Sequence, residues 1–242
     1  MTPEEFAQAL AAKGITLTAQ QQAQFNTYFE YLVSENEKMN LTAITAEGDV
    51  YLKHFYDSVT PLTEIPALRT AAVKLCDVGA GAGFPSLPMK ILNPQLQITI
   101  VDSLQKRIDF LDRLCKKLGL TGVELVHDRA ETFAGKKSAY REQFDLVTAR
   151  AVAALPVLAE LCLPLVRIGG QFIALKAAQA PNELTAAEPA LKLLGGNFAR
   201  DIAFQLPVLD ETRHLLVIDK AAATPQKYPR KPGTPAKQPI GG

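Results

Sequence analysis

The pattern of apolar and polar residues changes near residue 65. Before it, apolar side chains recur at helical spacing, as at Phe25, Phe29 and Leu32, which predicts amphipathic helices lying on a core. From Val73 onward, short apolar runs alternate with amphipathic stretches. We predict strands over 73–78, 97–102, 122–127, 144–149, 170–176, 199–206 and 212–219. Helices are expected over 104–118, 154–167 and 183–194.

Capping signals place the first helices. Thr2 with Glu5, and Thr18 with Gln21, have the spacing of capping boxes. A third helix is expected to start near Asp49. One face of that helix would carry His54, Asp57 and Ser58.

The stretch LCDVGAGAGFPSLP at 75–88 carries the strongest chemical signal. Its glycines at 79, 81 and 83 follow a predicted strand as G-x-G-x-G, one residue shorter than the dinucleotide fingerprint. Asp77 precedes them, and Asp102 ends the next strand, where a carboxylate can accept hydrogen bonds from two ribose hydroxyls. This layout is typical of an S-adenosylmethionine (SAM) site. The alternative is a tight strand-to-helix turn without a ligand.

Alternating strands and helices predict a parallel sheet with right-handed crossovers, closed by an antiparallel hairpin of the last two strands. With the glycine stretch, this predicts an α/β, Rossmann-like class I SAM-dependent methyltransferase fold. The sheet would be mostly parallel and seven-stranded, with helices on both faces and an N-terminal helical cap. We divide the chain into the cap (1–65), the SAM-binding methyltransferase domain (66–220) and a basic, proline-rich tail (221–242).

Prolines in the tail exclude helix and central strand there. The tail is then either a disordered end or an extended basic arm, lying back over the sheet or along a nucleic acid.

Composition is that of an ordinary soluble protein: 242 residues, 48% hydrophobic, with a net charge of +1. Residues 1–50 hold seven acids and two bases, a charge of −5 that leaves +6 for the remainder. Three cysteines without C-x-x-C spacing make a disulfide or a zinc site unexpected and fit a reducing cytoplasm. The longest apolar run, 151–166, is interrupted by Pro156, Glu160 and Pro164, so no membrane span is expected.

Ligands of a doubly wound sheet lie outside the carboxyl ends of its strands, which directs attention to the residues there. Arg129, Arg150 and Lys176 would crowd one rim. Because positive side chains are poor neighbours for the SAM sulfonium, we assign them to an anionic substrate such as RNA phosphate, or to pairing with Asp102 and Glu131.

The residues at the end of the fourth predicted strand limit which chemical groups could accept the methyl group. Thr148-Ala149-Arg150-Ala151 lacks the (N/D)-P-P-(F/Y) motif of enzymes that methylate exocyclic amines, and no cysteine is placed to attack a pyrimidine. A ring nitrogen such as guanine N7 needs neither, because its lone pair carries no proton. Catalysis would then be positioning without a general base. Two alternatives stay open: methylation of a small molecule or protein, and a SAM- or RNA-binding module without catalysis.

The histidines suggest less chemistry. His127 and His214 are interpreted as structural. His54 is of more interest because Asp57 follows one helical turn later, but a satisfied pair on a helix face is the favoured interpretation.

These motifs in this order resemble one family, the glucose-inhibited division protein B or RsmG group of bacterial 16S rRNA guanine-N7 methyltransferases. The resemblance covers nearly the whole chain. Ser86 and Ala177 stand where that family usually has glycine. The motifs are Asn40-Leu41-Thr42, HFYDS at 54–58, DVGAGAGFPSLP at 77–88, Asp102-Ser103-Leu104, Arg129-Ala130-Glu131, FDLVTARA at 144–151, GGQFIALK at 169–176 and YPRKPGTPAK at 228–237.

The resemblance implies SAM-dependent methylation of a guanine N7 in the 530 loop of 16S rRNA. The partner would be the small ribosomal subunit or its precursor, and the enzyme a cytoplasmic monomer without a metal. Cofactor-binding candidates are Gly79, Ala80, Gly81, Gly83, Phe84, Asp102, Ser103, Ala130, Glu131 and Arg150. RNA-binding candidates are His54, Arg129, Arg150, Lys176, Arg230 and Lys231.

Overall fold

A computed structural model describes residues 1–209 and 211–241. The helices are α1 (Pro3–Ala12), α2 (Ala19–Met39), α3 (Glu47–Asp49), the π-helix η1 (Val50–Tyr56), α4 (Asp57–Glu64), the 3-10 helix η2 (Pro66–Arg69), α5 (Ser86–Leu92), α6 (Gln105–Leu118), α7 (Ala130–Phe133), α8 (Leu155–Cys162), α9 (Ala180–Leu193) and α10 (Thr234–Lys237). The strands are β1 (Lys74–Val78), β2 (Gln97–Asp102), β3 (Val123–His127), β4 (Phe144–Arg150), β5 (Val166–Lys176), β6 (Gly196–Gln205) and β7 (Thr212–Lys220).

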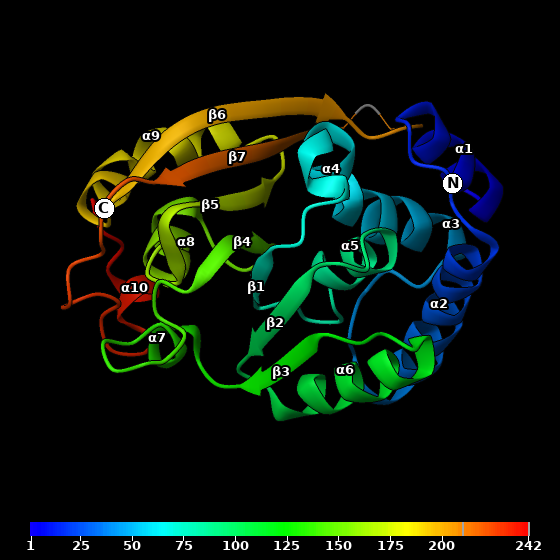
Figure 1. Cartoon of the computed structure of the whole chain (residues 1–242), viewed down its shortest axis with the longest axis horizontal. Coiled ribbons are helices and arrows are strands. Elements are labelled where there is room, and N and C mark those ends of the chain that lie inside the picture. Colours follow the sequence, from blue (N-terminus) through cyan, green and yellow to red (C-terminus); the bar gives the residue numbers. More distant parts are fainter. Residues whose placement is uncertain (210, 242) are drawn as a thin grey trace.

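The strands form one seven-stranded sheet in the order β3-β2-β1-β4-β5-β7-β6. Pairs from β3 to β5 are parallel, and β7 runs antiparallel to both β5 and β6. Figure 1 shows helices on both faces of this sheet. The predicted fold class, with its closing antiparallel hairpin, is therefore confirmed.

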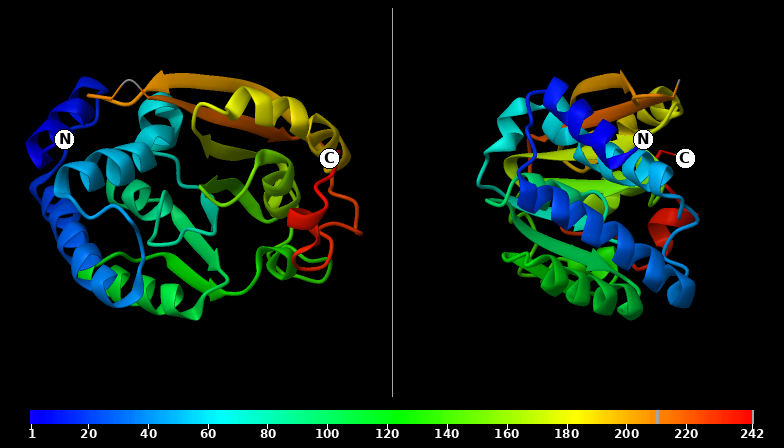
Figure 2. Two further views of the ribbon diagram at one scale, coloured as in Figure 1. Left: turned by 180° about the vertical axis from the view of Figure 1, so that it is seen from behind. Right: turned by 90° about the vertical axis from the view of Figure 1, so that its right-hand side faces the viewer.

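Each face of the sheet has its own apolar core because side chains alternate between the two faces of a strand. One face, with residues such as Ile98, packs against α2, α5, α6 and the N-terminal helices in one continuous cluster. The other face, with residues such as Cys76, packs against α8 and α9, and Tyr228 of the tail joins that cluster. The N-terminal helices and the tail lie at opposite ends of the molecule (Figure 2).

Both predicted capping boxes are present. Thr2 Oγ1 accepts from the Glu5 N–H while the Glu5 carboxylate accepts from the Thr2 N–H, and Thr18 and Gln21 repeat the exchange. The third helix differs from the prediction because the chain changes from the short α3 into a π-helix over Val50–Tyr56. Ser58 is fully buried instead of sharing an open face with His54.

The predicted helix over 154–167 ends early, at Cys162. Pro164 has no N–H to continue the helical hydrogen bonds, and the chain enters β5 at Val166. Gly169 and Gly170 therefore lie inside β5 instead of at its start. A Cβ on Gly170 would lie 2.7 Å from the Asp145 carbonyl oxygen, so β4 and β5 approach each other there as only glycine allows.

The tail is ordered against the body, and one part of its prediction is wrong. Thr234–Lys237 forms the one-turn helix α10, with Pro235 buried in its first turn. Proline is tolerated there because the first N–H groups of a helix have no partner within the helix. Of the two alternatives for the tail, the described residues adopt the packed arm and not the disordered end.

All three cysteines are free and buried, as expected. In the described part of the chain, no helix is both long and apolar enough to cross a membrane.

Candidate functional site

Two cavities meet at the carboxyl end of the sheet. The first, of about 290 Å³, lies between the ends of β1, β2 and β3 and is called here the glycine-loop cavity. The second, of about 420 Å³, lies between η1 and the ends of β4 and β5 and is called here the Arg150 cavity. Ala151, at the end of β4, lines both. Its φ of 57° is unusual for a residue with a side chain.

The glycine-loop cavity contains four of the predicted cofactor residues: Gly79, Asp102, Ser103 and Ala130. Its other lining residues are Val78, Val101, Arg107, Asp128, Ala151, Val152 and Leu161.

The three glycines after β1 all have positive φ, as the spacing predicts: 72° at Gly79, 60° at Gly81 and 102° at Gly83. Their surroundings differ. A Cβ on Gly81 would have no atom within 4 Å, whereas one on Gly83 would lie 2.6 Å from the Tyr28 hydroxyl. Gly81 therefore presents bare backbone to open space, while Gly83 lets the loop pack against the N-terminal helices.

Asp102 ends β2 and is almost fully buried. Its carboxylate accepts from the Gly81 N–H at 3.2 Å and from the Leu104 N–H at 3.0 Å. Arg107, on the first turn of α6, lies 3.4 Å away. This carboxylate thus joins the glycine loop to the end of β2 and lies where the predicted ribose contact requires an acceptor.

Asp77 lies beneath the loop and has no exposed surface. It accepts from the Ser86 N–H at 3.1 Å and from the Thr148 hydroxyl at 3.3 Å. Burial raises its pKa to about 7, against the lowering effect of these hydrogen bonds. Asp77 therefore connects β1 to β4 and to the start of α5 by hydrogen bonds, and it lines neither cavity.

Glu131 and Phe84, two of the predicted cofactor residues, have partners within the chain. The Glu131 carboxylate accepts from the Gly233 N–H of the tail at 2.8 Å, while the neighbouring Ala130 lines the cavity. Phe84 is buried and stacks between His54 and Tyr28, with ring centroids 4.6 Å and 5.5 Å away. These are the contacts of a core aromatic residue.

The Arg150 cavity is lined by ionisable side chains from elements far apart in sequence: Lys53, His54, Asp57, Arg150, Lys176, Glu183 and Arg213. Three of the predicted RNA-binding residues, His54, Arg150 and Lys176, are therefore together.

Arg150 fastens the cap to the sheet. Its guanidinium donates to Asp57 Oδ2 at 2.8 Å and to the Lys53 carbonyl at 3.0 Å. It also lies over the Phe84 ring, 5.1 Å from its centroid. Arg213 of β7 is 3.4 Å from the other Asp57 oxygen, so one carboxylate bridges two arginines.

His54 has a defined protonation state. Its Nδ1 is 3.4 Å from an Arg150 nitrogen, which can only donate, so Nδ1 accepts and Nε2 carries the proton. That Nε2 lies 2.8 Å from the Thr42 hydroxyl. Burial, then the Arg150 charge, lowers the pKa of His54 to about 4. The imidazole is therefore neutral near pH 7, with its one N–H directed at the Thr42 hydroxyl.

The alternative pairing of rim bases with Asp102 and Glu131 is wrong. Lys176 pairs with Glu183 at 2.6 Å, and Asp102 pairs with Arg107 instead. Arg230 donates to the buried Glu160. Arg129 and Lys231 are exposed.

The other histidines have structural partners, in line with their interpretation. His214 bonds to Asp201 on the neighbouring strand at 2.9 Å, and His127 lies 3.1 Å from the Ser103 carbonyl.

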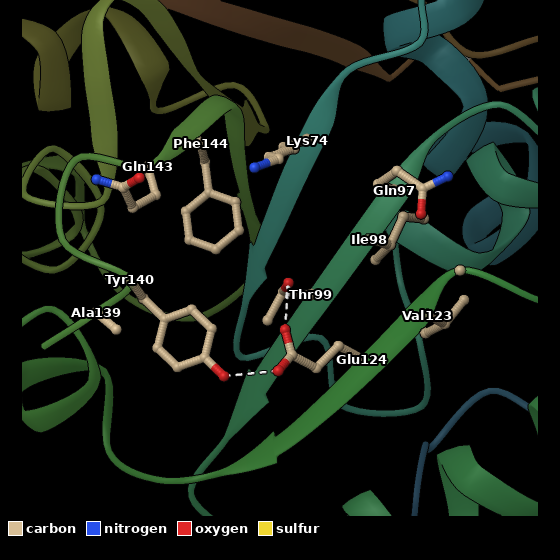
Figure 3. A pocket seen from close by; sticks show the side chains of 11 residues that line it. Lys74, Gln97, Ile98, Thr99, Val123, Glu124, Ala139, Tyr140, Gln143 and Phe144 are labelled. Atoms are coloured by element: carbon tan, nitrogen blue, oxygen red, sulfur yellow. Dashed lines mark hydrogen bonds between the residues drawn. The ribbon is translucent and has the colours of Figure 1, made fainter.

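A third cavity, of about 520 Å³, lies at the opposite end of the strands (Figure 3). Glu124 accepts there from Thr99 at 3.0 Å and from the Tyr140 hydroxyl at 2.6 Å. Tyr140 and Phe144 line the cavity together with residues at the starts of β1, β2 and β3. Its place at the amino ends of the strands separates it from the glycine loop.

Sequence reasoning missed Asp57 and Arg213 as members of the site. Asp57 was considered only as a partner of His54, and Arg213 lies in a strand with no motif. Alternation along β7 gives a weak signal, because it places Arg213 and the buried Leu215 on the same face.

The sheet order, the antiparallel β7 and the acidic end of β2 beside a glycine loop define the class I methyltransferase architecture. A SAM-dependent methyltransferase from Aquifex aeolicus shares it, with a TM-score of 0.51 at 14% identity over 67% of this chain and 90% of that one.

Sequence comparison is more specific. The family model for rRNA small subunit methyltransferase G matches residues 21–213. Ribosomal RNA small subunit methyltransferase G of Lacticaseibacillus paracasei is 65% identical over the full length of both chains. That of Lactiplantibacillus plantarum is 64% identical over 99% of this chain and 98% of the relative. The chain belongs to the rRNA small subunit methyltransferase G family.

Proposed function

We propose that this protein transfers a methyl group from SAM to N7 of a guanine in the 530 loop of 16S rRNA. Membership of the family supports rRNA as the substrate. The structural observation that supports the proposal is that Ala151 lines both cavities, so that they are neighbours. One cavity suits a nucleoside and the other a base held among charged groups. An rRNA substrate also implies work in the cytoplasm, where we propose that the enzyme acts as a monomer.

The glycine-loop cavity fits SAM by its acceptor group and its open backbone. Asp102 is an acceptor for ribose hydroxyls, and the bare backbone at Gly81 leaves room for a ligand. Ala130 and Ser103 would flank the nucleoside. Bound SAM would supply an electrophilic methyl group, and the residues that line the glycine-loop cavity would hold it beside the Arg150 cavity.

The Arg150 cavity would hold the guanine. A ring-nitrogen lone pair needs no base, so the cavity has only to align N7 and exclude water. Neutral His54 and the Arg150–Asp57–Arg213 cluster are polar groups fixed by their own hydrogen bonds, so they would lose little freedom on binding. Arg129 and Lys231, both exposed, are proposed phosphate contacts.

Isothermal titration with SAM, followed by transfer of a labelled methyl group to small subunits that lack the modification, tests the proposal. Asp102→Ala should weaken SAM binding by about 1.5–3 kcal/mol, because the ribose hydroxyls lose a charged acceptor. Asp109→Ala, on the exposed side of α6, is the matched control and should bind as the wild type does.

If SAM binds but no label reaches RNA, the proposed rRNA methylation is contradicted. The protein would then be a binding module or a methyltransferase that acts on another substrate. Unchanged SAM affinity in Asp102→Ala would remove Asp102 from the cofactor site.

A further inference from the structure

We propose that the C-terminal arm, residues 221–241, is a positioning element of the cofactor site through its contact with Glu131. The inference rests on the proposed function, because it takes the glycine-loop cavity as the SAM site. The arm would then act on cofactor affinity, in addition to any contact that its exposed lysines make with RNA.

Both ends of α7 are tied to the arm. In its first turn, the Glu131 carboxylate accepts from the Gly233 N–H at 2.8 Å. At its C-cap, the Ala134 carbonyl accepts from Arg141 at 3.0 Å, and the same guanidinium nitrogen donates to the Tyr228 carbonyl of the arm at 2.8 Å. A helix of four residues is not stable by itself. External contacts such as these therefore set its position.

The position of α7 matters because its first residue lines the glycine-loop cavity. Ala130 is the residue before Glu131, and it lies opposite the ends of β1 and β2 in that cavity. A shift of α7 would move the cavity wall without touching Asp102 or the glycine loop.

A second anchor fixes another wall. Arg230 of the arm donates to Glu160 of α8 at 2.6 Å, and Glu160 is buried. A buried carboxylate needs such a partner. Leu161, the next residue of α8, lines the same cavity. Figure 1 shows α7, α8 and α10 grouped at one end of the molecule, as these contacts require.

Binding coupled in this way is reciprocal: if the arm favours the SAM-binding position of α7, bound SAM must favour the ordered arm. The variant Gly233→Pro removes the N–H that holds Glu131, and it also displaces the arm from α7, because proline holds φ at about −65° and cannot adopt the φ of 83° found here. Gly233→Asn is the matched control, because asparagine keeps the N–H and tolerates the φ of 83° better than most residues. A Cβ at this position meets no atom within 4 Å.

The full-length variants should be compared by SAM titration and steady-state methylation. In Gly233→Pro we expect the Kd and KM for SAM to rise about fivefold or more, with kcat at saturating SAM and the KM for RNA unchanged. Gly233→Asn should stay near the wild type. A rise confined to the KM for RNA would overturn the inference and make the arm an RNA element.

A measurement on the wild-type protein avoids any folding defect of a variant. Hydrogen–deuterium exchange at residues 230–237 should slow when SAM is added, together with exchange at the glycine loop. Slowing at the glycine loop alone would overturn the inference while leaving the proposed function intact. Failure of the wild type to bind SAM at all would instead refute the proposed function.

Discussion

Asp77 shows how one buried group can support a site that it does not enter. It has no exposed surface, yet it accepts hydrogen bonds from both β4 and the first residue of α5, which follows the glycine loop. Its pKa of about 7 means that part of the population carries a proton near neutral pH. Because the pKa is higher in the folded protein than in the unfolded chain, this group stabilises the fold at low pH, and that contribution is lost as the pH rises from about 4 to about 7.

Asp77→Asn should therefore change how stability depends on pH. We expect the free energy of unfolding of the variant, relative to the wild type, to rise by about 2–3 kcal/mol between about pH 5 and about pH 8. Denaturant unfolding at the two pH values measures it. A constant difference between the two proteins would show that Asp77 titrates alike in both states.

At the scale of elements, the glycine loop is a joint between β1 and the N-terminal helices. The Tyr28 hydroxyl of α2 donates to the Ala82 carbonyl at 2.6 Å, and its ring stacks on Phe84. Gly83 lies against that hydroxyl, while Gly81 faces open space. Two glycines of one motif therefore have different reasons to lack a side chain.

Substituting each glycine by alanine should separate these reasons. Gly83→Ala should lower the free energy of unfolding by about 2–4 kcal/mol, because a Cβ adds both left-handed strain and a clash with Tyr28. Gly81→Ala should lower the free energy of unfolding only by the backbone strain, about 1–2 kcal/mol. For each kcal/mol of stability lost, Gly81→Ala should weaken SAM binding more than Gly83→Ala does. Thermal unfolding with SAM titration gives both quantities, and equal profiles for the two variants would contradict the assignment.

At the scale of the molecule, charge is distributed between paired and free groups. The cations of the Arg150 cavity are paired. Arg150 and Arg213 pair with Asp57, Lys176 with Glu183, and Lys53 with Asp49. Arg129, by contrast, is exposed close to Glu131 and the arm. Exposed cations near the site are the groups that RNA phosphates can reach without breaking an internal ion pair.

Arg129→Ala should therefore weaken RNA binding and reduce the slope of log affinity against log salt concentration by about 0.7–1. Lys74→Ala is the matched control, since Lys74 is exposed at the opposite end of β1. Binding titrations over a range of salt concentrations measure both slopes. The same slope in Arg129→Ala and wild type would exclude this arginine from the interface.

Contacts between residues far apart in the sequence could not be predicted from the sequence. Glu131 and Gly233 are 102 residues apart, and Glu160 and Arg230 are 70 apart. Glu131 was predicted to bind the cofactor and Arg230 to bind RNA. Each has a hydrogen-bond partner within the chain. No local pattern identifies such pairs, because a carboxylate at a strand end looks the same whether it meets a ligand or a distant N–H.

The sequence by itself determined the sheet, the capping boxes, the left-handed glycines and the place of Asp102, because these depend on burial periodicity and backbone sterics within a few residues. The tertiary structure alone decided that Asp57 joins Arg150 and Arg213, and that the tail packs as an arm. These features depend on which surfaces meet after the chain has folded. The cost of burying a charge then decides which of several chemically equivalent side chains form the ion pairs.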